Sequence, residues 1–166
     1  QAASPADAGA CLADAKPVQL GHAARADGAW RLYAFADTSG KRLRELAAFL
    51  AESPKSPIRR FTPASADIDS VIDVRAVFQQ PHRELKVQEL PAILLPRKGS
   101  FGLIDYEKAY CPDLRGGADI FDLRGIDRAK GAIVVVRPDQ YVSQVLPLDA
   151  HDELAAFFGQ FLLDRH

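Results

Sequence analysis

Methionine is missing from all 166 residues of the sequence, including the first position. A complete natural protein begins with methionine, so we expect this chain to be a piece of something longer or to have been processed. Cysteine is scarce as well. Cys11 and Cys111 lie far apart and match no CxxC pair, zinc site or disulfide scaffold. We therefore expect both to be reduced thiols in a cytoplasmic protein.

No charge of either sign is in excess. The 21 basic residues nearly balance the 22 acidic ones and leave a net charge of -1, which argues against recognition of nucleic acid through phosphate neutralisation. No apolar run is long enough to cross a bilayer, and the first residues show no signal-peptide pattern. The composition, 48% hydrophobic and 26% charged, is that of one globular domain with a substantial core.

Common catalytic motifs are also missing. The sequence contains no Gly-x-Ser-x-Gly elbow and no Walker-type loop. No Gly-x-Gly-x-x-Gly follows an expected strand, so the chain by itself carries no dinucleotide-binding fingerprint. The four histidines share no metal-ligand spacing. We therefore assign no catalytic, cofactor-binding or metal-binding residue.

The clearest pattern that is present lies at the C-terminal end. Residues 133–136 form an unbroken β-branched run, typical of a strand buried on both faces. Residues 137–140 predict a turn and residues 141–146 a second strand, which Pro147 ends. A helix capped by Asp149 is expected to follow. Its apolar face is predicted to contain Leu154, Phe157, Phe158, Phe161 and Leu162.

Earlier in the chain, residues 1–15 are rich in small and polar residues without periodicity, and predict a flexible leader or interdomain linker. The folded domain is expected to be 16–166. It begins with strands at 17–22 and 30–36. A helix capped by Thr38 or Ser39 and ended by Ser53-Pro54 comes next. Its predicted inward face consists of Leu43, Leu46, Ala47 and Leu50.

The middle of the chain gives weaker patterns. Residues 58–61 fit a short strand or an irregular crossing, and residues 71–78 fit a strand with Asp73 and Arg75 on one face. A second helix is predicted from Pro81 or His82 to about Leu90. Residues 120–123 predict a short strand or extended run.

Residues 91–118 combine prolines and glycines with many apolar side chains. We expect an irregular apolar insert, which must be covered either by its own domain or by another. Closing the domain's own core and forming an interface are equally good interpretations. The interface candidates are Leu94, Leu95, Phe101, Leu103, Ile104 and Tyr106.

The element order is roughly β-β-α-β-α, the insert, and then β-β-α. A helix between strands implies a right-handed crossover and a parallel pair, and the final hairpin adds antiparallel strands. This is the α/β, thioredoxin-like arrangement, a mixed sheet with flanking helices and a ββα ending. Residues 35–41, where a thioredoxin enzyme holds its reactive cysteine, contain none. An alternative function, a thiol oxidoreductase or peroxidase, would have to use Cys111.

Two charge-rich stretches, 59–73 and 119–128, are interpreted as structural ion-pair clusters or solvated edges rather than ligand sites. Arg137 and Asp139 are expected to hold the corner of the C-terminal hairpin. A small-molecule binding domain is a further alternative. Its pocket would be lined by aromatic residues at strand spacing, namely Tyr33, Phe35, Phe78 and Tyr141.

Several segments, taken in order, resemble one family. They are residues 12–22, 30–35, 67–75, 95–99, 102–108, 119–127 and 135–142. Together they resemble the C-terminal domain of the phenol hydroxylase family of FAD-dependent aromatic monooxygenases, over nearly all of residues 12–163. The resemblance implies a non-catalytic, thioredoxin-like domain that takes part in subunit association, with a homodimer expected. It also implies an N-terminal part of the same polypeptide that binds FAD, contacts NADPH and holds the aromatic substrate.

Overall fold

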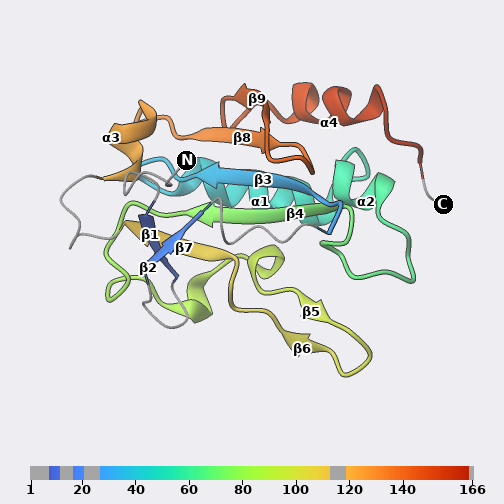
Figure 1. The fold of residues 1–166 in the computed structure, drawn as a ribbon, viewed down its shortest axis with the longest axis horizontal. Coiled ribbons are helices and arrows are strands. Elements are labelled where there is room, and N and C mark those ends of the chain that lie inside the picture. The colour runs from blue at the N-terminus through green and yellow to red at the C-terminus, as the bar shows by residue number, and fades with distance from the viewer. Residues whose placement is uncertain (1–7, 12–16, 21–26, 113–118, 165–166) are drawn as a thin grey trace.

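The structure is a computed structural model that describes residues 8–11, 17–20, 27–112 and 119–164. A seven-stranded mixed sheet in the order β2-β1-β7-β4-β3-β8-β9 forms its centre (Figure 1). A separate two-stranded hairpin pairs β5 with β6. The strands are β1 (Ala8–Cys11), β2 (Pro17–Gln19), β3 (Trp30–Phe35), β4 (Ile72–Val77), β5 (Arg97–Lys98), β6 (Leu103–Ile104), β7 (Ala109–Pro112), β8 (Ala132–Val136) and β9 (Val142–Leu146).

The connections follow the predicted thioredoxin-like order. Strands β3 and β4 are parallel and are joined through helix α1 (Lys41–Glu52), as a crossover requires. Strand β8 is antiparallel to β3, and β9 is antiparallel to β8. Helix α4 (His151–Gly159) then ends the ββα unit. In Figure 1, α1 lies behind β3 and β4.

The two faces of the sheet bury different clusters, because successive residues of a strand point to opposite sides. Leu32 and Ala34 of β3 belong to the larger cluster, which includes residues of α1, α2 (Pro57–Phe61) and α4. Tyr33 and Phe35 belong to the smaller cluster, together with residues of α3 (Ile120–Arg124). We call these the first and second faces. The predicted inward residues of α1 are all buried: Leu43, Leu46, Ala47 and Leu50.

Three predicted elements have a different structure. Residues 58–61 belong to α2 rather than to a strand, since Pro57 stands at the start of the helix where its fixed φ is favourable. The predicted helix 82–90 contains only turns and the 3-10 helix η2 (Val87–Glu89), because its apolar residues do not recur at helical spacing. Residues 120–123 form α3, capped by Asp119, whose carboxylate accepts a hydrogen bond from the Phe121 amide at 2.8 Å.

The leader prediction is wrong for Ala8–Cys11, which form β1 and pair with β7 and β2. The remainder of that leader lies outside the described residues. The insert prediction is wrong for Ala109–Pro112, which form the buried strand β7 of the central sheet. The other elements of the insert are short: the 3-10 helix η3 (Ala92–Leu94) and the β5–β6 hairpin. β7 escaped prediction because its apolar run is only four residues long and ends in proline.

The caps of α1 and α4 also differ from expectation. Gly40, not Thr38 or Ser39, is the N-cap of α1. The first amides of the helix are accepted by two side chains, Lys41 N–H by the Ser39 hydroxyl and Leu43 N–H by the Asp37 carboxylate, both at 3.2 Å. Ala150, not Asp149, is the N-cap of α4 and makes no side-chain cap. The predicted apolar face of α4 is confirmed in part, because Phe161 and Leu162 follow the end of the helix and Phe161 is 45% exposed. Leu154 and Phe158 are buried, and Phe158 meets Trp30 edge to face at 5.5 Å.

Candidate functional site

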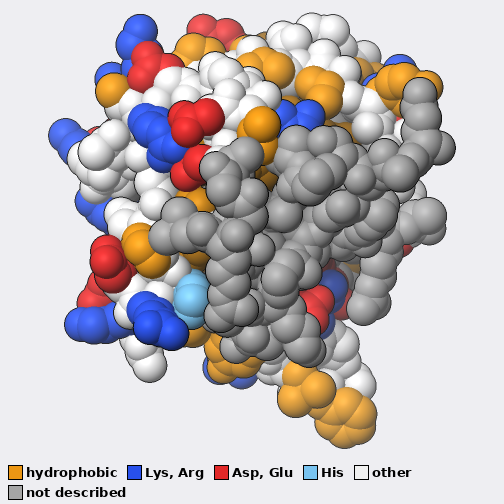
Figure 2. Space-filling view, turned by 60° about the vertical axis from the view of Figure 1, so that its left-hand side comes forward, with side chains coloured by type: hydrophobic (Ala, Val, Ile, Leu, Met, Phe, Trp, Pro, Cys, Tyr) orange, Lys and Arg blue, Asp and Glu red, His pale blue; other side chains and the backbone are white. Residues whose placement is uncertain are grey.

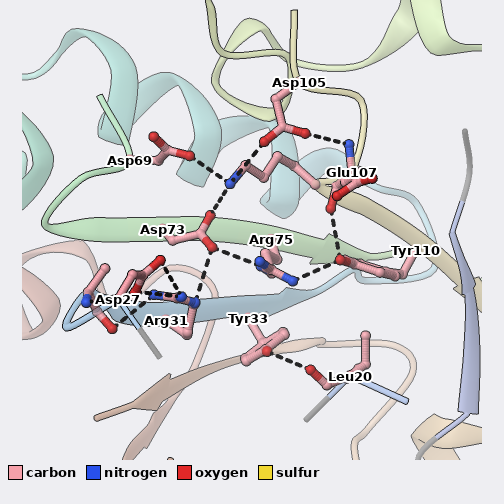
Figure 3. Close-up of polar contacts among 12 residues, drawn as sticks. Leu20, Asp27, Arg31, Tyr33, Asp69, Asp73, Arg75, Asp105, Glu107 and Tyr110 are labelled. Atoms are coloured by element: carbon pink, nitrogen blue, oxygen red, sulfur yellow. Dashed lines mark hydrogen bonds and ion pairs between the residues drawn. The ribbon is translucent and has the colours of Figure 1, made fainter. Parts of the chain in front are cut away.

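A network of buried charges lies on the second face, across β3, β4 and the start of β7 (Figure 3). Asp73 stands at its centre. Its carboxylate meets Nζ of Lys108 at 2.6 Å, Nε of Arg75 at 2.9 Å and Nε of Arg31 at 3.2 Å. All four side chains are less than 10% exposed. One carboxylate therefore contacts cations from three different strand regions.

The network reaches outward from Lys108 to the β5–β6 hairpin. Lys108 Nζ also lies 2.7 Å from Oδ2 of Asp69, and Lys98 of β5 lies 2.9 Å from the same oxygen. Next to Asp69, Asp67 accepts the Gly99 amide at 3.0 Å. The end of β5 and the first residue of the hairpin turn are thereby tied to the buried charges of the sheet.

The network shifts the ionisation of its members. Burial alone would raise the pKa of Asp69, but hydrogen bonds from Lys108 and Lys98 outweigh it and hold that pKa below its ordinary value. Burial opposes the charge of Lys98 too, yet its contact with Asp69 raises the pKa of Lys98. Burial also disfavours the charged form of Arg75, and Asp73 outweighs it to raise the pKa of that group. Each group thus stays charged at neutral pH.

This network bounds a polar recess of about 590 Å³, but its carboxylates are engaged by cations. Among the described residues, no group of three or more His, Cys, Asp or Glu could hold a metal ion. The ion-pair interpretation of 59–73 is confirmed for Asp69 and Asp73. Their cationic partners lie outside this stretch, and Arg60 within it pairs with Asp164 at 2.9 Å instead. The network therefore has a structural role, which is to hold β3, β4 and β7 together with the β5–β6 hairpin.

The second charged stretch has the predicted structural role. Arg128 bridges Asp119 at 3.0 Å and Asp122 at 3.2 Å, which ties the turn before β8 to the start of α3. The hydrogen bond that Arg128 donates to Asp119 raises the pKa of Arg128. In the C-terminal hairpin, Arg137 pairs with Asp139 at 2.7 Å, as predicted.

The interface candidates divide into two groups. Leu94 is only 2% exposed and belongs to the first-face core, so an interface role is wrong for it. Phe101 is 89% exposed, Leu103 71% and Tyr106 46%, while Leu95 and Ile104 are half-buried. The hairpin that carries Phe101 and Leu103 projects from the body in Figure 1, and Figure 2 shows hydrophobic side chains at a protruding tip on that side.

A second apolar feature is a hollow of about 330 Å³ on the second face. Tyr33 and Phe35 line it, as the pocket hypothesis predicted. Phe78 lies in the first-face cluster instead, and Tyr141 is 72% exposed and outside the lining. The lining residues missed include four valines of β8 and β9, together with residues of and around α3 and of the hairpin turn. They are Val134, Val136, Val142, Val145, Leu20, Ile120, Arg124, Ile126 and Gln140. The unbroken β-branched run of β8 carried the signal, since a strand apolar on both sides needs cover on both sides.

Thiol chemistry has little support in the described residues. Asp37, Thr38 and Ser39 follow β3 where a redox cysteine would lie. Cys111 belongs to β7 and is 0% exposed, whereas reactive thiolates are partly accessible to their substrates. The side chain of Cys11 lies outside the described part of the chain.

Comparison with known proteins decides the family. The sequence profile described as phenol hydroxylase, C-terminal dimerisation domain, matches residues 7–166. The chain belongs to this family. As a phenol hydroxylase dimerisation domain, it is homologous to FAD-dependent aromatic monooxygenases.

Two curated relatives agree with this assignment. Over 157 residues the domain is 55% identical to a 3-hydroxybenzoate 4-monooxygenase of Comamonas testosteroni, covering 91% of this chain and 25% of that protein. It is 35% identical to the FAD-dependent monooxygenase terD of Aspergillus terreus, covering 90% and 25%. The domain thus spans about a quarter of the length of these relatives.

One solved structure is also similar, that of copper-bound ScoI of Arabidopsis thaliana. It has 15% sequence identity and a TM-score of 0.45, covering 93% of this chain and 96% of that one. Within the described residues, none of the helices combines the length and apolar character needed to cross a membrane.

Proposed function

We propose that this domain joins two copies of a longer FAD-dependent aromatic monooxygenase and holds no part of its catalytic machinery. The observation that carries the proposal is the 55% identity to a 3-hydroxybenzoate 4-monooxygenase, which extends over 91% of this chain but only 25% of that enzyme. In this proposal the N-terminal part of the polypeptide binds FAD, takes reducing equivalents from NADPH and holds the aromatic substrate. A hydroxybenzoate is the first substrate to test, and phenol the second.

The surface we assign to association is the β5–β6 hairpin with the residues beside it. Phe101, Leu103 and Tyr106 are large apolar side chains held at 46–89% exposure, and clustered exposed apolar groups mark interaction sites. Ion pairs of Lys98 with Asp69 and Asp105 hold the hairpin in place. A preorganised contact surface loses less entropy when it binds. Leu95 and Ile104, both half-buried, are the less exposed members of this surface.

Size-exclusion chromatography with light scattering on the whole chain tests this proposal. We expect the wild-type chain at twice 18.1 kDa, and Leu103→Asp and Tyr106→Asp at the single mass, because a carboxylate buried in an apolar contact is strongly unfavourable. Leu163→Asp is the control, since Leu163 is 78% exposed and lies outside the assigned surface. A wild-type monomer would contradict the association role. A variant dimer would contradict only the assigned surface.

The parent enzyme has a separate test. An immunoblot of source-cell extract with antibody to this chain should show a band several times 18.1 kDa. The purified polypeptide should be yellow and should oxidise NADPH faster when 3-hydroxybenzoate is added. A band near 18.1 kDa would contradict the monooxygenase part of the proposal, while the association role of the domain would still stand.

A further inference from the structure

Among the described residues, the second face of the sheet is covered less than the first. Residues of α1, α2 and α4 take part in the first-face cluster. On the second face the described helix is α3, which has only five residues. A sheet of this kind needs apolar cover on both faces. Part of the second face therefore remains exposed beside α3.

The exposed part is one wall of the apolar hollow, formed by the β9 valines. Tyr33 and Phe35 form its buried floor. Val134 and Val136 of β8 are half-buried, and their partners across β9 are Val145 and Val142. The register shifts between Val135 and Val136, and this bulge keeps both β9 valines on the hollow side. Val142 is 55% exposed and Val145 60% exposed.

Strand β9 also stands at one edge of the seven-stranded sheet. Its sequence, Val142 to Leu146, contains no charged residue and no proline. Natural edge strands are usually protected by such residues. An exposed edge strand with an apolar side and without charged residues or proline is typical of a surface that another chain covers.

The same chain presents a protruding feature of matching chemistry. Phe101, at 89% exposed, tops the β5–β6 hairpin, which projects from the body in Figure 1. An aromatic side chain buries about 150–250 Å² on insertion, and a hollow of about 330 Å³ lies at the small end of ligand pockets. In a twofold dimer, a hollow cannot be filled by the same hollow of the other copy. A protruding side chain and a hollow on the same chain can instead form two equivalent contacts, one in each direction.

We propose that Phe101, at the tip of the β5–β6 hairpin, inserts into the apolar hollow of a second copy. The second copy's Phe101 inserts into the hollow of the first in return. This proposal rests on the proposed association function, and it adds the surface to which the hairpin binds. Two equal contacts would then close the dimer and leave neither apolar feature exposed. The buried charges around Asp73 would hold each hairpin at the angle that insertion needs, through Asp69 and Lys98.

Complementary variants of the whole chain test the exchange. Phe101→Lys removes the knob, and Val145→Asp places a carboxylate in the hollow. Each variant alone should be monomeric by light scattering, with dimer affinity weakened at least about tenfold, equivalent to 1.4 kcal/mol. An equimolar mixture should form a heterodimer. One contact in it is wild type, and the other sets the introduced lysine of one copy against the introduced carboxylate of the other.

Other results would overturn the exchange. If Val145→Asp alone stays dimeric, the hollow is not part of the interface. If both variants are monomeric and the mixture stays monomeric, the hairpin and hollow do not meet. Crosslinking from p-benzoyl-phenylalanine at position 101 provides a second measurement. We expect attachment to residues 132–146 of the other copy. Attachment to residues 101–106 of the other copy would contradict the exchange and indicate a hairpin-to-hairpin dimer. A monomeric wild-type chain would instead contradict the association function itself.

Discussion

Nζ of Lys108 lies 2.6 Å from Oδ1 of Asp73, and neither side chain is more than 5% exposed. The same carboxylate holds Arg75 and Arg31. Asp73→Ala should therefore lower the free energy of unfolding by about 3–5 kcal/mol, because removing one partner leaves uncompensated buried charges. Urea denaturation followed by circular dichroism measures this loss.

The control for Asp73→Ala is Lys55→Ala. Lys55 pairs with Asp152 at 3.2 Å, but the two side chains are 70% and 80% exposed. Exposed pairs contribute about 0–1 kcal/mol. Equal losses in the two variants would mean that burial of the Asp73 network adds nothing to stability.

Asp69 should make stability depend on pH. Its pKa is lower in the folded chain than the ordinary value of 3.8, so its contribution is fully present above that value and is lost as the pH falls through the folded-state pKa. At neutral pH, Asp69→Asn should cost about 1.5–3 kcal/mol, as expected for a hydrogen bond to a charged group. The difference between the two proteins should shrink as the pH drops below 3.8.

Denaturant titrations of wild type and Asp69→Asn, from neutral pH to below 3.8, measure this effect. Asp152→Asn provides the comparison, because Asp152 is 80% exposed in its pair and its loss should cost less than about 1 kcal/mol. A gap between wild type and Asp69→Asn that stays constant, or widens, as the pH falls would contradict the role given to the Asp69 carboxylate.

Patterns that depend on local sequence predicted much of the fold. Alternation of apolar and polar residues predicted the strand at 30–36, observed as β3, and helical spacing identified the buried side of α1. The wrong predictions concern segments whose secondary structure is determined by long-range contacts. Strand β7 is short and acquires its identity by lying beside β4 and β1, which no local pattern records.

The candidate surfaces show the same division. Composition marked residues 91–118 as apolar but could not separate buried Leu94 from exposed Leu103, because that distinction depends on which residues the hairpin turns outward. Asp73 and Lys108 are 35 residues apart. Their pairing follows from the parallel alignment of β4 with β7, so the network was not predictable from spacing alone.

Leu94 and Leu103 should behave oppositely on substitution. Leu94→Ala should cost about 2–5 kcal/mol in thermal or urea unfolding, because Leu94 is 2% exposed in the core and leaves a cavity. Leu103→Ala, at 71% exposed, should change the stability of the isolated monomer by less than about 0.5 kcal/mol. If Leu103→Ala strongly lowers the free energy of unfolding of the monomer, Leu103 has a core role and does not belong to the assigned interface.

Gly131 fixes the turn that leads into β8. Its φ is +66°, and a Cβ there would collide with the Phe35 carbonyl and lie 2.9 Å from the Asp37 amide. Gly131→Ala should therefore combine left-handed strain of about 1–2 kcal/mol with overpacking of about 1–3 kcal/mol. Gly125→Ala is the matched control, since its φ is +62° and nothing lies within 4 Å of its Cβ position. Equal melting temperatures for the two variants would contradict the close approach of β3 to this turn.

Cys111 should be inert while the chain is folded. Its side chain is 0% exposed within β7, and a thiol needs access and thiolate character to react. In a Cys11→Ser background, the thiol reagent DTNB should label Cys111 only as fast as the domain opens, and immediately once urea unfolds it. Labelling of the native protein as fast as of the unfolded one would reopen the thiol-enzyme alternative. Slow native labelling together with an unchanged dimer in Cys111→Ser would restrict this cysteine to a packing role.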